Sequence, residues 1–369
     1  MTRRALAVSM LAVAAMIPAA AHAEPASPAA PASTSAARGV APFELIDRVI
    51  YVRGSINGSR PLWLLISSGS GQSAVDAAVA RELNLGSAGS ARLALGGAEL
   101  PIENIAVVDL SAAEDQIGHQ VDAVIGYDLF SRFVVEIDYY GQILRLHDQA
   151  GYRPDPRFAS LPLRIHGRRA YLRAGVELAG LPASRRDYRL DTGLGGALVD
   201  EAVRDATSPK IEIVGEAAGA PSTVTLTRTK SVQLGPFRFA GANGFAGEAS
   251  VGGELLRRFT TIIDYAGGKL SLLPNRHYED RFCFEMLGVE LSLVRDGGGM
   301  RIDAIYRSST AEQAGLKVGE ILTAIDGRPT TDFSLGQVRM MFGQQNSYVL
   351  TISQGAAVRQ VPVILSPTL

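Results

Sequence analysis

The sequence predicts a mainly β protein with two homologous β lobes and a separate C-terminal domain. Short apolar stretches bounded by Gly-rich turns follow one another along residues 41–278, and few of them have the length and period of a helix. A duplication is the second observation, because residues 67–69 and 191–193 form similar turns 124 residues apart. Residues 133–139 likewise return as residues 259–265. Two motifs repeated at nearly one offset indicate two related structural units.

The two turns differ at their first position. The later copy reads Asp191-Thr192-Gly193, and the earlier copy reads Ser67-Ser68-Gly69. Both turns continue into Gly-rich segments and reach another Asp at the same spacing. The earlier copy therefore keeps the spacing of the later one but carries a hydroxyl where the later one carries a carboxyl.

The N-terminus has the features of a secretory signal. Arg3 and Arg4 precede an apolar run, and Ala21-His22-Ala23 is a small-residue cleavage site, which predicts a signal peptide over residues 1–23. Residues 24–40 are rich in Pro, Ala and Ser, as expected of a disordered linker. We therefore expect an exported protein, periplasmic or secreted, with no membrane span after signal removal.

Composition excludes several functional classes. Without residues 1–23 the chain has 34 basic and 37 acidic side chains, a formal charge of −3, which argues against nucleic-acid binding. Cys283 is the only cysteine, so neither an intrachain disulfide nor a thiolate metal cluster is expected; its position between two Phe residues predicts burial. Four histidines lack the helical i, i+4 partner of a metal site, and we expect no metal or cofactor. They are His119, His147, His166 and His277.

The first lobe is assigned to residues 41–152. Residues 49–56 and 61–66 are predicted strands on either side of a turn at Asn57-Gly58, and the second strand leads into the Ser67 turn. Asp76 then precedes a short helical segment and is expected to cap it. Val124-Ile125-Gly126 is an apolar element that leads into the strand at residues 133–139.

The second lobe, residues 153–278, repeats this plan. Residues 170–178 and 188–190 are the predicted strands before the Asp191 turn, and Asp200 is expected to cap the following helix. Residues 250–256 match the apolar element less closely, and the lobe ends in the strand at residues 259–265.

Residues 44–275 resemble the bacterial retropepsin-like aspartyl proteases in their two-lobed, single-chain form. The two turns, the strand before each of them, Val124-Ile125-Gly126 and the repeated Phe-to-Tyr segment carry this resemblance. It implies retropepsin/pepsin-like β lobes whose turns meet at the bottom of a cleft. Two Asp residues there share a proton, so that one activates a water molecule and the other donates to the scissile carbonyl. By resemblance, Asp191, Thr192 and Gly193 form the catalytic turn, and the hydroxyls of Thr192 and Ser68 bond across to the opposite lobe.

The resemblance is incomplete because Ser67 cannot act as a base at neutral pH. Asp76 and Asp200 occupy equivalent positions and are better explained as helix caps, and Asp138 and Asp264 are expected to be structural. Three hypotheses follow. The first is an inactive pseudoprotease that serves as a peptide-binding or adaptor protein. The second is residual aspartic endopeptidase activity through Asp191 with a water held by Ser67, and the third is a homodimer that joins two Asp191 turns. No Gly-x-Ser-x-Gly elbow supports a serine nucleophile.

The remaining segment, residues 281–369, resembles a bacterial PDZ domain. A short capped helix before Ala314-Gly315-Leu316, a strand into Asp326-Gly327, a helix at residues 335–342 and two last strands carry the resemblance. It implies that an extended peptide binds as an added strand and that backbone N–H groups bind its carboxylate. The implied carboxylate-binding loop is Leu287, Gly288, Val289 and Glu290. Two roles are open for Val338, Met341 and Phe342: they line the apolar pocket or they pack inside the domain. An alternative role for the whole domain is intramolecular, in which it covers or regulates the cleft between the lobes.

Overall fold

The computed structural model describes residues 37–86, 89–217, 220–295 and 298–366. The expected signal peptide and most of the expected linker, residues 24–36, lie outside the described residues. Within them the chain is mainly β, which confirms the predicted class. No helix in these described ranges is both long enough and apolar enough to cross a membrane.

The segment from residue 39 to residue 148, called the first repeat below, consists of short strands and three short helices. Its elements are β1 (Gly39–Ile46), β2 (Val49–Ile56), β3 (Leu62–Ile66), β4 (Ala74–Asp76), α2 (Ala77–Glu82), β5 (Gly89–Leu95), β6 (Ala98–Val108), α3 (Ser111–Ile117), β7 (Ala123–Ile125), α4 (Tyr127–Phe130), β8 (Phe133–Asp138) and β9 (Ile143–Asp148).

The segment from residue 159 to residue 274, called the second repeat, follows a similar order. Its elements are β10 (Ala159–His166), β11 (Arg169–Glu177), β12 (Ser184–Leu190), β13 (Leu198–Val199), the 3-10 helix η1 (Glu201–Asp205), β14 (Lys210–Ala217), β15 (Ala220–Arg228), β16 (Ser231–Leu234), β17 (Phe237–Phe239), β18 (Asn243–Phe245), β19 (Ser250–Val251), α5 (Gly253–Leu256), β20 (Phe259–Asp264) and β21 (Lys269–Pro274).

The two repeats share an uncommon set of strand pairings. In the first repeat β3 runs parallel to β7, and β4 pairs antiparallel with β7 and parallel with β6. In the second repeat β12 runs parallel to β19, and β13 pairs antiparallel with β19 and parallel with β18. Because β3 ends one residue before Ser67 and β12 ends one residue before Asp191, the same local arrangement positions both turns. The predicted helix caps are also present: Ala78 N donates to Asp76 Oδ1 at 2.7 Å, and Ala202 N donates to Asp200 Oδ1 at 2.9 Å.

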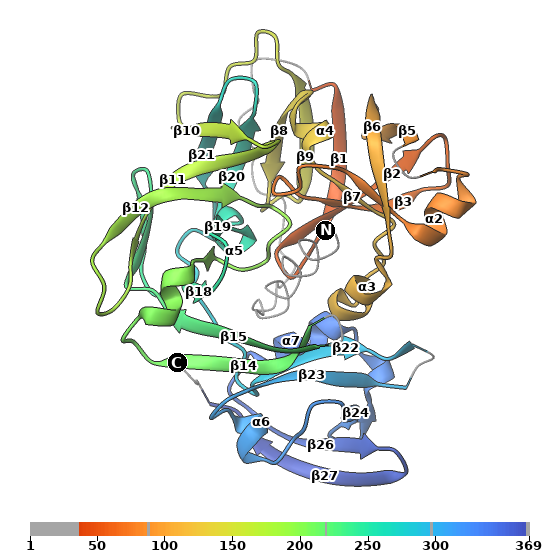
Figure 1. Cartoon of the computed structure of the whole chain (residues 1–369), viewed down its shortest axis with the longest axis vertical. Coiled ribbons are helices and arrows are strands. Elements are labelled where there is room, and N and C mark those ends of the chain that lie inside the picture. The colour runs from red at the N-terminus through yellow and green to blue at the C-terminus, as the bar shows by residue number, and fades with distance from the viewer. Residues whose placement is uncertain (1–36, 87–88, 218–219, 296–297, 367–369) are drawn as a thin grey trace.

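One antiparallel sheet joins the repeats, in the order β1, β9, β8, β20, β21, β10. Its two central strands are the repeated Phe-to-Asp segments, and Glu136 of β8 lies opposite Ile262 of β20. Both strands are buried over five of their six residues, and the buried positions include the polar residues Glu136, Thr260 and Thr261. Figure 1 shows this sheet at the end of the molecule opposite the C-terminal strands.

The first hairpin of each repeat also reaches the other repeat. Asp47 and Arg48 form the two-residue turn between β1 and β2 with φ values of 47° and 64°, and Gly167 and Arg168 form the equivalent turn between β10 and β11 with values of 56° and 64°. Arg48 pairs with Glu254 of α5, and Arg168 lies 3.4 Å from Asp128 of α4. These reciprocal contacts fasten the two repeats to each other.

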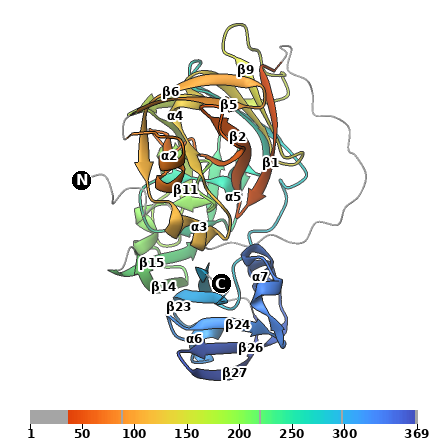
Figure 2. The same cartoon turned by 90° about the vertical axis from the view of Figure 1, so that its right-hand side faces the viewer.

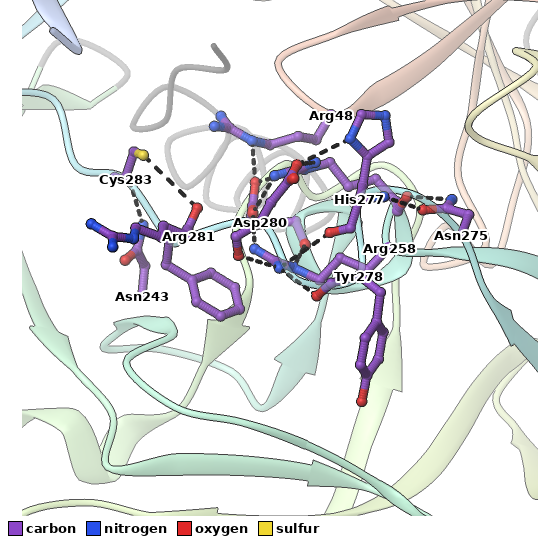
Figure 3. Close-up of polar contacts among 12 residues, drawn as sticks. Arg48, Asn243, Arg258, Asn275, His277, Tyr278, Asp280, Arg281 and Cys283 are labelled. Carbon is purple, nitrogen blue, oxygen red and sulfur yellow. Dashed lines mark hydrogen bonds and ion pairs between the residues drawn. The ribbon is translucent and has the colours of Figure 1, made fainter.

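Glu254 is the centre of a buried charge cluster. Its carboxylate also accepts from Arg257 at 2.9 Å and from Arg258 at 2.8 Å. Burial acts in the opposite direction, but the guanidinium groups of Arg48 and Arg257 lower the pKa of Glu254 to about 2. Arg258 extends the cluster by donating to the main-chain oxygens of Tyr278 and Asp280 at 3.0 and 2.5 Å (Figure 3). The cluster therefore reaches the segment that leaves the second repeat.

The C-terminal module, β22 to β27, has its own apolar core around Val338 and Leu350. Its elements are β22 (Val289–Leu293), β23 (Met300–Tyr306), α6 (Thr310–Gln313), β24 (Ile321–Ile325), β25 (Arg328–Pro329), the 3-10 helix η3 (Thr330–Asp332), α7 (Leu335–Phe342), β26 (Ser347–Gln354) and β27 (Ala357–Ile364). Antiparallel pairing runs through β22, β23, β24, β26 and β27.

The C-terminal module contacts both repeats. Strand β14 of the second repeat pairs with β23, with Val214 opposite Ile305. Helix α3 of the first repeat contacts β22, and its end lies beside α7 (Figure 1). Figure 2 shows the C-terminal module, in blue, on the side of the molecule where α3 and β14 lie. The module is thus held by a strand of one repeat and a helix of the other.

The expected burial of Cys283 is wrong. Its side chain is exposed, whereas Phe282 and Phe284 on either side are buried. Successive side chains of an extended segment point to opposite sides, so the two larger rings take the interior and the thiol faces outward.

Candidate functional site

Ser67 and Asp191 meet where β3 and β12 end. Ser67 Oγ donates a hydrogen bond to Asp191 Oδ1 at 3.0 Å, and the two residues are 7% and 4% exposed. The sequence predicted these positions as equivalent, and the structure brings them into direct contact. The Ser67 turn also lies against the side of the Asp191 turn that a second Asp191 would have to approach, which disfavours the homodimer hypothesis.

Four buried hydrogen bonds lock the two turns together. Ser68 Oγ donates to Leu190 O at 2.8 Å, and Thr192 Oγ1 donates to Ile66 O at 2.8 Å. Each hydroxyl also accepts from the opposite main chain: Ser68 N lies 3.0 Å from Thr192 Oγ1, and Thr192 N lies 3.1 Å from Ser68 Oγ. The pattern is symmetric, so each turn gives and receives the same two hydrogen bonds although their first residues differ.

The glycines of the two turns permit this close approach. A Cβ atom on Gly69 would lie 2.1 Å from Asp191 Cγ, and one on Gly193 would lie 2.6 Å from Ser67 Oγ. Neither position accepts a side chain unless the opposite turn moves. The third residue of each turn must therefore be Gly, because Asp191 lies against Gly69 and Ser67 lies against Gly193.

Asp191 has two further partners, and one of them was missed by the sequence analysis. Gly193 N donates to Asp191 Oδ1 at 2.9 Å. The buried Arg189 guanidinium lies 3.4 Å from Asp191 Oδ2, and it also pairs with Glu248 at 2.7 Å. Leu65 is the equivalent residue of β3, so the cation belongs to one turn only. Strand β12 contains three Arg residues, so no signal in the sequence singles out Arg189.

Two equivalent tyrosines lie near the turns. Tyr265 Oη donates to Ser68 O at 2.8 Å. The Tyr139 hydroxyl is buried and has no hydrogen-bond partner among the described residues. Burial, helped by the charge of Asp191, raises the pKa of both tyrosines above the usual range, so both are neutral near pH 7. They supply hydroxyl groups near the site but no second base.

The other acids that the sequence analysis considered have structural roles. Asp138 Oδ1 accepts from Gly141 N at 2.9 Å, and Asp264 Oδ1 accepts from Gly267 N at 2.7 Å, so each closes the turn after its strand. Asp76 and Asp200 cap helices, as described above. The described part of the chain contains no group of three or more His, Cys, Asp or Glu side chains that could hold a metal ion.

A second candidate site lies where β22 begins. The main-chain N–H groups of Leu287 and Val289 donate to the Glu285 carboxyl at 3.0 and 3.1 Å, and Gly288 N donates to it as well. Gly288 has a φ of 84°, and a Cβ atom there would lie 2.2 Å from Ser309 Cβ. The loop expected to bind a carboxylate therefore already holds a carboxyl group from its own chain. The role of Glu285 is not predictable from the sequence, because nothing in its sequence neighbourhood shows which way those N–H groups point.

The remaining residues of the expected peptide site are interior. Val338 is 0% exposed and Phe342 is 1% exposed, and both pack in the core of the C-terminal module with Leu287 and Val289. Of the two roles considered for Val338 and Phe342, packing inside the domain is the one observed. Glu290 does not face the loop donors; its carboxyl accepts from Tyr306 Oη at 2.6 Å.

Both buried glutamates are unusual acids. Burial raises the pKa of Glu285 to about 8, although three backbone N–H groups and Arg339 act in the opposite direction. Burial also raises the pKa of Glu290 to about 8, against the effects of Tyr306 and Arg339. In each case the loss of hydration outweighs the hydrogen bonds and the nearby cation.

Comparison with known protein families identifies the C-terminal module. Residues 301–349, from β23 to the start of β26, match the family described as the PDZ domain. This match confirms the prediction of a PDZ domain, a type of domain that binds peptides. A comparison with curated proteins gives no match.

Proposed function

We propose that this chain is an aspartic-peptidase-like protein that binds polypeptides between its two repeats and has lost most or all hydrolytic activity. The hydrogen bond from Ser67 Oγ to Asp191 Oδ1 is the observation that carries the proposal. It lies within a complete lock between two equivalent turns, as expected of a retropepsin-like centre in which a hydroxyl has replaced one carboxyl.

The chemistry of peptide hydrolysis explains the expected loss. A carboxyl pair supplies a base for the water molecule and an acid for the scissile carbonyl. Ser67 is neither at neutral pH, so Asp191 would have to perform both roles. Removing one positioned acid or base typically costs about 10²–10⁴-fold in rate. A chain that keeps the lock but lacks this group is better suited to binding than to cutting.

Residual peptidase activity is the second candidate, and one observation favours it. Asp191 keeps an ordered set of partners, Gly193 N at 2.9 Å and Arg189 at 3.4 Å, so its carboxyl orientation is fixed. An oriented carboxyl group beside the Ser67 hydroxyl is able to hold a water molecule that contacts both groups. In this candidate Asp191 is the base, and the Ser67 hydroxyl donates to the carbonyl or to the water.

Peptide recognition by the PDZ domain and export complete the proposal. The PDZ domain supports binding of a polypeptide at a site separate from Asp191. Export rests on the basic, apolar and small-residue segments of residues 1–23. Together they describe an exported protein whose ligands are polypeptides.

Digestion of an unfolded protein and of a mixed peptide library by the purified mature chain, from pH 3 to pH 8, tests the proposal. The matched variants are Asp191→Asn, which removes the remaining carboxyl, and Ser67→Asp, which restores the second one. We expect no cleavage by the wild type and cleavage by Ser67→Asp. Cleavage by the wild type that disappears in Asp191→Asn would instead establish the residual peptidase.

A further inference from the structure

The PDZ domain meets the first repeat through charged and apolar contacts. Arg339 of α7 forms a buried ion pair with Asp47 and donates to Gln116 O, just within α3, at 2.6 Å. Arg295, which follows β22, pairs with Asp115 of α3 at 3.0 Å. Gly118, at the end of α3, packs so closely that a Cβ atom there would lie 2.7 Å from Leu335 Cβ.

These contacts lie at the edge where a PDZ domain takes its ligand. A PDZ ligand adds as a strand to an exposed sheet edge. Here β22 pairs with β23 on one side, and α3 and α7 lie against it. Arg339 Nη2 also donates to Leu291 O in β22 at 3.1 Å, so a side chain occupies a main-chain acceptor of that strand. The carboxylate-binding loop, in turn, is filled by Glu285.

We propose that the PDZ domain is closed by its own chain, with the Glu285 carboxyl group as the internal ligand of the carboxylate-binding loop and α3 as the cover of the β22 edge. A polypeptide with a free C-terminal carboxylate then binds only by displacing Glu285 and releasing α3 and Asp47. This inference rests on the peptide recognition that forms part of the proposed function.

The closed state and the liganded state exclude each other, so the two are coupled. Any ligand that binds only the open domain weakens the contact with the first repeat, and any change that weakens that contact strengthens ligand binding by the same factor. The loop offers three N–H donors, and an ionised carboxylate is a stronger acceptor for them than a neutral acid. A C-terminal carboxylate therefore competes with Glu285 for these donors.

The coupling also has a contact route towards Asp191. Asp47 precedes Arg48, which pairs with Glu254 of α5. The first residue of α5, Gly253, donates its N–H to Leu194 O at 2.6 Å, and Leu194 N lies 3.3 Å from Asp191 O. Release of Asp47 from Arg339 thus frees the turn that contains Arg48. Arg48 contacts helix α5, and α5 in turn is bonded to the Asp191 turn through Leu194.

The test measures peptide binding by full-length mature protein with fluorescence anisotropy. The probe is a pool of fluorescein-labelled octapeptides with a free C-terminus ending in Val, Leu or Phe, and the same pool with amidated C-termini is the control. We compare the wild type, Glu285→Ala and Glu279→Ala, an exposed glutamate outside the loop. We expect Glu285→Ala to bind the free-acid pool at least about tenfold more tightly than the other two proteins, and no protein to bind the amidated pool.

A second variant addresses the cover without altering the PDZ domain. Asp47→Asn weakens the pair with Arg339 from the first repeat, and Asn accepts the positive φ of this turn position. We expect Asp47→Asn to bind the free-acid pool more tightly than the wild type does. In a separate measurement, we expect amide exchange across α3 of the wild type to become faster when the free-acid pool is added. This arm keeps the proposal testable if Glu285→Ala does not fold.

The outcomes separate the inference from the proposed function. Equal binding of the free-acid pool by the wild type, Glu285→Ala and Asp47→Asn would overturn the closed state while leaving peptide recognition intact. Failure of every protein to bind the free-acid pool would overturn peptide recognition itself, and the closed state with it.

Discussion

Arg339 and Asp47 form a buried ion pair across 292 residues of sequence, between helix α7 of the PDZ domain and the first hairpin turn of the chain. Their side chains are 5% and 4% exposed, so both charges have lost nearly all their hydration. Arg339 is further bound by the main-chain oxygens of Gln116 and Leu291. One side chain thus connects the first repeat, helix α3 and strand β22.

Replacement of Arg339 by Met tests how much this pair stabilises the closed arrangement. The variant leaves Asp47 buried without its partner, and breaking a buried pair in this way costs about 3–5 kcal/mol. Urea unfolding followed by circular dichroism is expected to show the loss. Arg301→Met is the matched control, because Arg301 pairs with Asp303 at the surface and is 55% exposed. Surface pairs contribute only about 0–1 kcal/mol. Equal unfolding midpoints for Arg339→Met and Arg301→Met would contradict the assigned role.

Thr192→Val tests the lock between the two turns. Valine keeps the shape of the side chain but leaves the buried Ile66 O and Ser68 N without their hydrogen bonds. Each unsatisfied buried group costs about 1–3 kcal/mol, so for the two groups we expect a loss of roughly 2–6 kcal/mol in unfolding free energy. Exposed Thr331→Val is the control. A loss no larger than the control's would mean that the hydroxyls do not hold the turns together.

Local sequence predicted the frame around the site well. The apolar strand before Ser67 and the capped helix α7, whose Ser334 and Gln337 form a capping box, both follow from short-range patterns. The contact of Ser67 with Asp191 was accessible only because the two turns repeat. Arg339 with Asp47 has no such repeat, and nothing local in the sequence pairs them. Glu285 was missed because its role depends on the direction of three backbone N–H groups rather than on a motif.

The free energy of unfolding is expected to fall as the pH rises from about 5 to about 8, because Glu285 and Glu290 are buried in the folded protein. The pKa of Glu285 and that of Glu290 are about 8 in the folded protein, against an ordinary value of 4.5. In this window the folded state keeps protons that the unfolded chain has released, so unfolding becomes more favourable with each increment of pH. Below the ordinary value both states are protonated, and the stabilisation is fully present.

The groups that face these acids define the test. Glu285 faces the N–H groups of its loop and Arg339, and Glu290 faces Tyr306, Arg339, Glu285 and Asp47. Urea midpoints at pH 5, 7 and 9 are compared between the wild type and the double variant Glu285→Gln, Glu290→Gln. We expect a smaller decline in the double variant because its amides do not titrate. Parallel declines in the two proteins would show that other groups cause the pH dependence.

Gly69→Ala probes the distance between the two turns. The added Cβ would lie 2.1 Å from Asp191 Cγ, which no contact between carbon atoms allows, so the turns must separate or the Asp191 side chain must rotate away from Ser67. We expect a loss of about 1–3 kcal/mol in unfolding free energy, as for other overpacked sites. Gly86→Ala is the matched control, since a Cβ atom there meets nothing within 4 Å.

If Ser67→Asp proves active in the digestion assay, adding Gly69→Ala is expected to abolish that activity, because a restored carboxyl is useful only beside a correctly placed Asp191. Retention of activity in the double variant would show that the close approach of Gly69 to Asp191 is not required.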